Sequence, residues 1–145
     1  MRDCNGCTAC CSVNGIIELE KPIRTKCPHS CPLGCDRYET RPQSCHNFYC
    51  TWIRGYGTEE QRPDKLGVFA EERLDETLGR GFFVKEVTPG ALEKPEVIRH
   101  LQALRVDTGK PVYVLDWDLK TAIGEILTPA EERKEIKKRR RRARK

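Results

Sequence analysis

The sequence predicts a small α+β protein in which a cysteine-rich, loop-dominated N-terminal module packs beside a short sheet with a covering helix, followed by a basic C-terminal helix or tail. Three observations lead to this prediction. All nine cysteines lie between Cys4 and Cys50, the next segment has the order strand, strand, helix, strand, and the last residues are almost all Lys or Arg. We place the boundaries at residues 1–53, 54–127 and 128–145.

The N-terminal module has the sequence of loops and short turns, because Asn-Gly pairs and prolines recur through it. Ile16, Ile17 and Leu19 predict one short strand, and Pro42 is suited to open a helical turn that carries Cys45. The composition is 37% hydrophobic and 34% charged. Such a chain builds a modest core and gains much from covalent or metal staples.

The first cysteines have the spacing of tight metal loops. Cys4, Cys7 and Cys10 are separated by two residues each, so that successive sulfurs can converge on one centre. Zinc takes four thiolate or imidazole ligands, and a [4Fe–4S] cluster also takes four cysteines, often three local and one remote. Repeated short spacings favour the cluster, since zinc sites more often use two separate pairs. Cys11 follows directly and points away from Cys10, so either two centres lie close together or Cys11 packs as a small apolar side chain.

Five further cysteines can complete such centres. They are Cys27, Cys31, Cys35, Cys45 and Cys50. His29 and His46 flank them, but with so many thiols at hand we expect both imidazoles at the surface or behind the ligands. A disulfide framework is the minority interpretation, because nine is an odd number and because reducing compartments keep thiols free.

The cysteine pattern resembles that of the CxxCxxCC family, whose members are described as zinc- or iron-chelating proteins. The resemblance rests on the opening C-x2-C-x2-C-C, on Cys27, and on G-C-x2-Y-E-x-R-P-x2-C-x2-F-x-C-x-W from Gly34 to Trp52. It covers residues 4–52 and is weaker beyond them. The family includes proteins that resemble flagellin lysine N-methylases, which gives the chain an alternative interpretation as an iron–sulfur enzyme or redox protein that acts on another protein.

The resemblance implies a metal-binding module with eight thiolate ligands, enough for two four-coordinate centres. These ligands are Cys4, Cys7, Cys10, Cys11, Cys27, Cys35, Cys45 and Cys50. Cys31 departs from the pattern and is either a spare thiol or a substitute ligand.

The middle of the chain predicts the sheet and its helix. Residues 66–70 and 82–87 have the β-branched and aromatic content of strands, and residues 112–117 form a third apolar run. Between them, apolar side chains recur at helical spacing from Pro95 to about Arg105. We expect this helix to cover one face of the sheet.

The C-terminal segment predicts a capped basic helix. Thr128, Pro129 and Glu131 match a capping box with proline at the first helical position. From Arg133 onward, ten cations and the single acid Glu135 carry a charge of +9, and subtracting this from the net +5 leaves −4 for residues 1–132. The densest cations are Lys137, Lys138, Arg139, Arg140, Arg141, Arg142, Arg144 and Lys145. Without aromatics among them, we expect sequence-independent contact with nucleic acid phosphates, or docking on an acidic protein surface.

Taken together, these patterns predict a metal-binding protein without catalytic residues. A [4Fe–4S] cluster is slightly preferred and zinc is the alternative. The basic tail would attach the protein to nucleic acid or a larger assembly. The first 13 residues lack the apolar run of a signal peptide, and no run of about 18 apolar residues suggests a membrane helix. We therefore expect a cytoplasmic protein without membrane contact.

Overall fold

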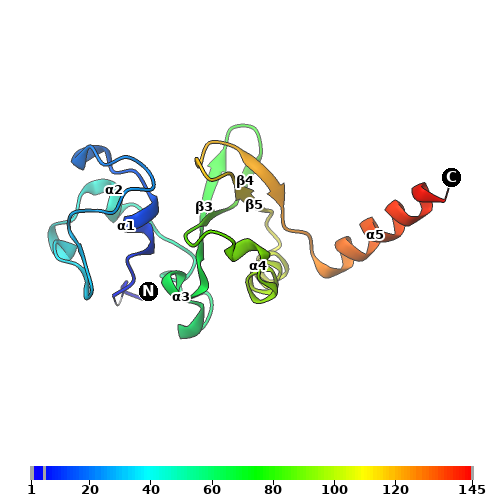
Figure 1. Cartoon of the computed structure of the whole chain (residues 1–145), viewed down its shortest axis with the longest axis horizontal. Coiled ribbons are helices and arrows are strands. Elements are labelled where there is room, and N and C mark those ends of the chain that lie inside the picture. The colour runs from blue at the N-terminus through cyan, green and yellow to red at the C-terminus, as the bar shows by residue number, and fades with distance from the viewer. Residues whose placement is uncertain (1, 5, 145) are drawn as a thin grey trace.

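The computed structural model describes residues 2–4 and 6–144, and its parts follow one another along the long axis (Figure 1). The cysteine-rich module lies at one end, a four-stranded sheet with its covering helix lies in the middle, and the last helix projects from the other end. The prediction of a small α+β protein is confirmed.

The module is made of short elements joined by loops. They are α1 (Ala9–Val13), η1 (Ile17–Leu19), β1 (Ser30–Cys31), β2 (Gly34–Cys35), η2 (Tyr38–Thr40) and α2 (Gln43–His46). The helical turn predicted after Pro42 is confirmed by α2. The strand predicted at Ile16, Ile17 and Leu19 is wrong. Ile16 forms only an isolated bridge with Lys21, and the chain between them turns through η1 because Glu20 takes a left-handed conformation at its end.

The sheet has the strand order β3-β4-β5-β6. Its elements are β3 (Val68–Asp75), β4 (Gly79–Glu86), β5 (Val112–Leu115) and β6 (Ala122–Glu125), with α4 (Pro95–Thr108) between β4 and β5. The connections before β3 and α4 carry η3 (Glu59–Gln61), α3 (Pro63–Leu66) and η4 (Ala91–Glu93). β3 and β4 form an antiparallel hairpin, β4 and β5 run parallel, and β6 returns antiparallel to β5. The parallel step requires a crossover, and α4 supplies it.

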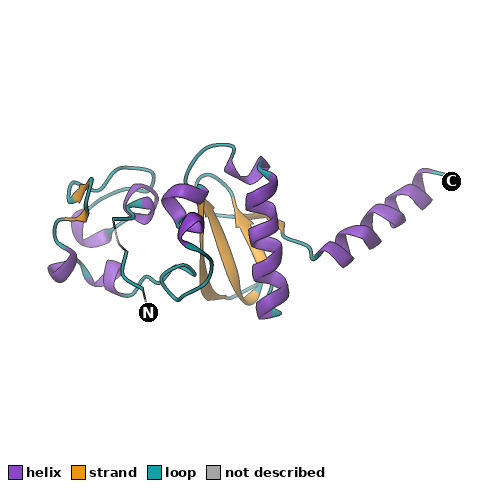
Figure 2. Cartoon of the chain, turned by 90° about the horizontal axis from the view of Figure 1, so that it is seen from below, coloured by secondary structure: helices purple, strands orange, loops and turns teal. Residues whose placement is uncertain are grey.

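The main core lies between α4 and one face of the sheet (Figure 2). Alternation along the strands turns every second side chain to this face, and the helical spacing turns a matching stripe of α4 toward it. The core consists of Leu66, Val68, Ala70, Phe82, Val84, Ala91, Val97, Leu101, Leu104, Val112 and Val114. Burying each Leu or Val here stabilises the fold by about 1.5–3 kcal/mol. The predicted covering helix is confirmed.

The module packs against the opposite face of the sheet. Phe48 meets Phe69 of β3 edge to face, with ring centroids 5.5 Å apart. The backbone N–H of Thr51 donates to the carbonyl of Ala70 at 2.9 Å, so that the end of the module extends the edge of β3. This contact places Cys50 directly over the sheet, in a second core with Trp52 and Phe69.

Arg24 fixes the module to the far side of the sheet. Its guanidinium lies 3.6 Å from the centroid of the Trp117 ring and donates to the backbone carbonyls of Trp117 and Glu86. Arg24 itself has a φ of 58°, a left-handed conformation that a non-glycine residue adopts at a cost. The stacking and hydrogen bonds offset that cost.

The strands differ from prediction in their bounds and in one additional strand: β4 begins at Gly79 and ends at Glu86 instead of covering residues 82–87, and β5 ends at Leu115 instead of residue 117. Leu66 ends α3 instead of starting a strand, and β3 begins at Val68 after Gly67 turns the chain with a φ of 90°. β6 was not predicted, because Gly124 and the exposed Ile123 give it no inward-facing alternation. The described residues contain no helix long and apolar enough to cross a membrane.

The predicted basic helix is confirmed as α5 (Pro129–Ala143). Both bonds of the capping box are formed. The N–H of Glu131 donates to the Thr128 hydroxyl at 3.1 Å, and the N–H of Thr128 donates to the Glu131 carboxylate at 2.9 Å. No residue of α5 is buried among those described, so the helix gains its order from its own sequence.

Candidate functional site

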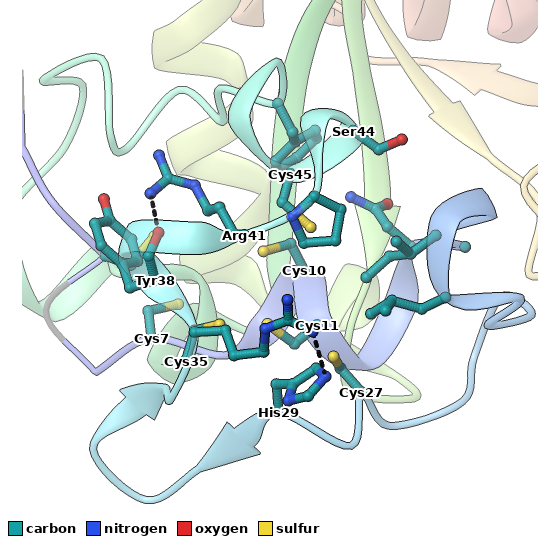
Figure 3. A pocket seen from close by; sticks show the side chains of 18 of the residues that line it. Cys7, Cys10, Cys11, Cys27, His29, Cys35, Tyr38, Arg41, Ser44 and Cys45 are labelled. Atoms are coloured by element: carbon teal, nitrogen blue, oxygen red, sulfur yellow. Dashed lines mark hydrogen bonds between the residues drawn. The ribbon is translucent and has the colours of Figure 1, made fainter.

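The cysteines gather around one cavity of about 410 Å³ inside the module. Seven of the nine contribute to its wall, together with apolar side chains such as Ile16, Leu19 and Phe48. Figure 3 shows the sulfurs of the labelled cysteines around this space. An apolar wall around thiols lowers the local dielectric and limits the access of water, as in protein metal sites.

The first cysteine group consists of Cys4, Cys7, Cys10 and Cys50. These four side chains line a small cavity of about 20 Å³ on the sheet side of the module, against Trp52. Burial raises the pKa of Cys4 to about 11, and the neighbouring charges of Cys50 and Cys7 add to this rise. Three local cysteines and the remote Cys50 therefore share one environment.

The second cysteine group consists of Cys11, Cys27, Cys35 and Cys45. Burial raises the pKa of Cys45, and the charges of Cys11, Cys27 and Cys35 raise it further. Burial likewise raises the pKa of Cys35, which also senses Cys11 and Cys27. Residues from α1, the loop before β1, β2 and α2 thus meet on the outer side of the module.

The adjacent pair Cys10 and Cys11 joins the two groups. The Cys10 thiol donates a hydrogen bond to the Cys11 sulfur, which lowers the pKa of Cys11 to about 7 and raises that of Cys10 well above its ordinary value. The charges of Cys11, Cys4 and Cys50 raise the pKa of Cys10, and Cys11 in turn acts on Cys4 as well as on Cys35 and Cys45. The prediction that these neighbouring side chains point apart is wrong, because their sulfurs lie within hydrogen-bond distance of each other.

Backbone hydrogen bonds reach sulfurs in both groups. Burial raises the pKa of Cys7, and backbone hydrogen bonds from Ala9 and Asp64 partly offset this rise. A backbone hydrogen bond from Arg37 acts on Cys35 in the same way. Bonds from the residue two positions after a cysteine stabilise its thiolate form, and hydrogen bonds of this kind tune metal–thiolate centres.

Lys21 places a buried positive charge beside the second cysteine group. The side chain is only 7% exposed, and its ammonium donates to the carbonyl oxygens of Asn14 at 2.5 Å and Pro22 at 3.2 Å. Burial lowers the pKa of Lys21, and the charges of Cys27 and Cys11 counter this. Among the described residues, no carboxylate lies within ion-pair distance of it. The cysteines are its available counter-charge.

Tyr38 and Arg41 stand beside the first cysteine group. The Arg41 guanidinium lies 4.0 Å from the centroid of the Tyr38 ring and donates to the Tyr38 carbonyl at 2.8 Å. Its charge acts to lower the pKa of Cys4. Burial raises the pKa of Tyr38, with contributions from the charge of Cys4 and from a hydrogen bond with it. Tyr38 and Arg41 belong to the motif on which the resemblance rests, but no role was predicted for them or for Lys21.

The remaining candidates lie apart from the two groups. Cys31, in β1, is not among the residues that line either cavity. His29 borders the larger cavity, but its ring nitrogens contact the Asp36 carboxylate at 3.1 Å and the Arg37 guanidinium at 3.4 Å. His46 lies in α2 and lines neither cavity.

The sulfurs of each group are neighbours without forming a closed cage. Across residues 2–4 and 6–144, no three Cys, His, Asp or Glu side chains are arranged so that they could hold a metal ion between them. The number and type of the donor atoms fit a thiolate-bound metal. The sulfurs, however, are held apart by the cavity between them.

The candidate phosphate-binding cations lie on α5, far from the cysteines (Figure 1). Residues 137–142 are all exposed, as is Arg144 at the end of the helix. Lys145 lies outside the described residues. The two candidate sites therefore occupy opposite ends of the molecule.

No family model matches this chain, and neither a curated protein nor a solved structure does. The resemblance to the CxxCxxCC family therefore stays a prediction that rests on the cysteine spacings.

Proposed function

We propose that the protein is a metal-binding protein in which two thiolate-ligated centres stabilise the N-terminal module. The observation that carries the proposal is that eight of the cysteines line two cavities with shared walls, the first group the smaller one and the second group the larger one. Each group has the number of thiolates that a [4Fe–4S] cluster or a zinc ion takes. The first group would hold one centre and the second group the other.

The electrostatics of the site support bound cations. Burial raises the pKa of Cys4 and Cys45, and the charges of neighbouring cysteines raise it further, so these thiols lose their protons readily only when a metal replaces the protons. The buried ammonium of Lys21 also needs an anion, because an unpaired buried charge costs several kcal/mol. A thiolate–metal centre carries net negative charge and meets that need.

The size of the larger cavity, which cysteines of both groups line, favours a cluster over a single ion. Zinc lies about 2.3 Å from each thiolate sulfur, which requires the four sulfurs to close tightly around it. The cavity of about 410 Å³ leaves more space than one ion fills. We therefore prefer a [4Fe–4S] cluster. Zinc is the alternative, and the sulfurs would have to move inward to bind it.

Metal and sulfide analysis of anaerobically purified protein tests the proposal. Brown protein with iron and acid-labile sulfide supports clusters, and colourless protein with bound zinc supports the alternative. Cys45→Ser should lose the centre of the second group, and Cys7→Ser that of the first. Cys31→Ser is the matched control and should keep both. Metal-free wild-type protein, or equal metal loss in all three variants, would contradict the proposal.

We further propose that α5 attaches the protein to nucleic acid phosphates. The charge of +9 on residues 133–145 contrasts with −4 on residues 1–132. Neutralising phosphates with these cations releases counterions. A chain truncated before Arg133 should lose its salt-sensitive retention on immobilised nucleic acid and keep its metal content. Unchanged retention would contradict the phosphate contact.

A further inference from the structure

The cations of α5 surround the helix instead of lining one face. Successive residues of an α-helix are turned by about 100°, so the six consecutive cations of residues 137–142 point to most sides of the axis. Only a narrow strip with Ile136 and Ala143 is left without charge. A flat or one-sided anionic partner would face about half of these cations and leave the others without counter-charge. The distribution suits a partner with phosphates on two sides.

The helix stands clear of the body and is accessible from all sides. Its described hydrogen bonds to the rest of the chain come from the first turn, where Glu131 accepts from Arg105 at 3.4 Å and Glu132 accepts from Gln102 at 3.2 Å. The two views of the whole molecule agree with this, since α5 projects away from the sheet in both Figure 1 and Figure 2. The negatively charged body is thereby kept away from the surface that α5 would bind.

The sequence of α5 favours a preformed helix. Glu131 and Glu132 lie at the positive end of the helix dipole, and Arg140, Arg141 and Arg142 lie at its negative end, which stabilises both termini. Arg139 also pairs with Glu135 one turn away, at 3.2 Å. A helix with this charge order needs less ordering on binding than a disordered basic tail would.

We propose that α5 lies in the major groove of double-stranded DNA, with its cations contacting the phosphates of both groove walls. This inference rests on the phosphate contact proposed above. The major groove of B-form DNA is about 12 Å wide, and an α-helix with its side chains is about 10–12 Å across. With 15 residues, α5 spans about 22 Å of groove.

Other nucleic acids fit this cation distribution less well. A single strand offers phosphates along one side of the helix, and aromatic side chains that would stack its bases are lacking from Arg133 onward. The major groove of A-form RNA is deep and too narrow to admit the helix. The same segment has no Asn or Gln to read adenine, so we expect the contact to depend on groove shape and charge.

Binding of the full metal-loaded chain to three probes of equal length tests the inference: duplex DNA, single-stranded DNA and duplex RNA. Fluorescence anisotropy over a range of salt concentrations gives the affinity and its salt slope, which changes by about 0.9 for each phosphate contact with duplex DNA. We expect duplex DNA to bind at least about tenfold more tightly than either other probe, with the steepest slope.

A helix-breaking variant distinguishes the contribution of the helical conformation to DNA binding from that of the positive charge. Ile136→Pro keeps every cation but interrupts α5, whereas the control Ile136→Ala keeps both charge and helix. The proline variant should bind duplex and single-stranded DNA equally, and the alanine variant should keep the duplex preference. Equal binding of all probes by the wild type, or a duplex preference that survives Ile136→Pro, would overturn the groove inference while leaving the phosphate contact standing. Absence of binding to every probe would overturn both.

Discussion

The sheet unit and the cysteine module are stabilised in different ways. The sheet unit pairs two eight-residue strands and buries eleven residues in one cluster against α4. The module has helices and strands of two to five residues, and few of its own apolar side chains are buried. Its buried residues include two cysteines, Cys27 and Cys50, and part of its interior is formed by contact with the sheet. The comparison indicates that the sheet unit has a core of its own, whereas the module has few buried apolar side chains to hold it together.

The contact between the two regions matters less to the main core of the sheet unit than to the module. Phe69 and Lys85 on the second face of the sheet receive the module, and Lys85 donates to Asn14 at 2.9 Å and contacts Glu71 at 3.1 Å. The α4 face is complete without these contacts. Loss of order in the module should therefore uncover one face of the sheet without emptying the main core.

Removing metal should have the largest effect, and it should be confined to the module. A structural thiolate–metal site contributes on the order of 10 kcal/mol to folding. We expect a chelator, with a reductant present, to abolish the protection of backbone amides within residues 6–50 against hydrogen exchange. Amides of β3, β4 and α4 should stay protected. Mass spectrometry of peptides from both regions measures this, and equal loss of protection in both would show that the sheet unit is not self-sufficient.

Leu101→Ala should have the next largest effect, and it should fall on the sheet unit. Leu101 is 1% exposed in the main core, and truncating such a side chain costs about 2–5 kcal/mol. Urea unfolding followed by circular dichroism measures the loss, and metal content per folded molecule should not change. Leu74→Ala is the control, because Leu74 is 68% exposed. A loss of metal from the Leu101 variant at temperatures where it remains folded would contradict the separation of the two regions.

Lys21→Met should weaken one centre and spare the other. The substitution removes the buried charge beside the second cysteine group but keeps an unbranched apolar stem. Supporting residues of metal sites change affinity by about 10–100-fold when they are replaced, and we expect a loss of that size for the second group only. Competition with a metal chelator measures it. Lys21→Arg keeps the charge and should be milder, and equal losses in the two variants would show that the charge is not what matters.

Local patterns predicted the sheet unit better than the cysteine site. The helical spacing of Val97, Leu101 and Leu104 predicted a helix with one buried face, and all three residues lie in the main core. The spacing of Cys4, Cys7 and Cys10 likewise kept three cysteines together. Which distant cysteine joins which group depends on loops without periodicity, so spacing alone does not assign it. Lys21 reaches the sulfurs through tertiary contacts that no motif encodes.

The pH dependence of stability should be opposite in the two regions, and this is the smallest of the expected effects. In the metal-free module, burial raises the pKa of Cys4 from its ordinary 9.0 to about 11. A raised pKa means that the folded state favours the protonated thiol, so the stability it contributes is present below pH 9 and is lost as pH rises toward 11. In the sheet unit, a hydrogen bond from Lys110, with another from Arg54, lowers the pKa of Glu72. Its contribution is present above the ordinary 4.5 and is lost as pH falls below it.

Bound metal should remove the loss of stability at alkaline pH and leave the loss at acidic pH unchanged. Once a metal has displaced the protons of the thiols, raising the pH deprotonates nothing further in the cysteine groups, and it strengthens binding by reducing competition from protons. Urea unfolding at a series of pH values, with and without metal, distinguishes the regions. Glu72→Gln should flatten the acidic limb alone, because Glu72 contacts Lys110 and Arg54 and no cysteine. An alkaline loss of equal size with and without metal would contradict thiolate ligation by the two groups, because tyrosines and lysines titrate alike in both forms.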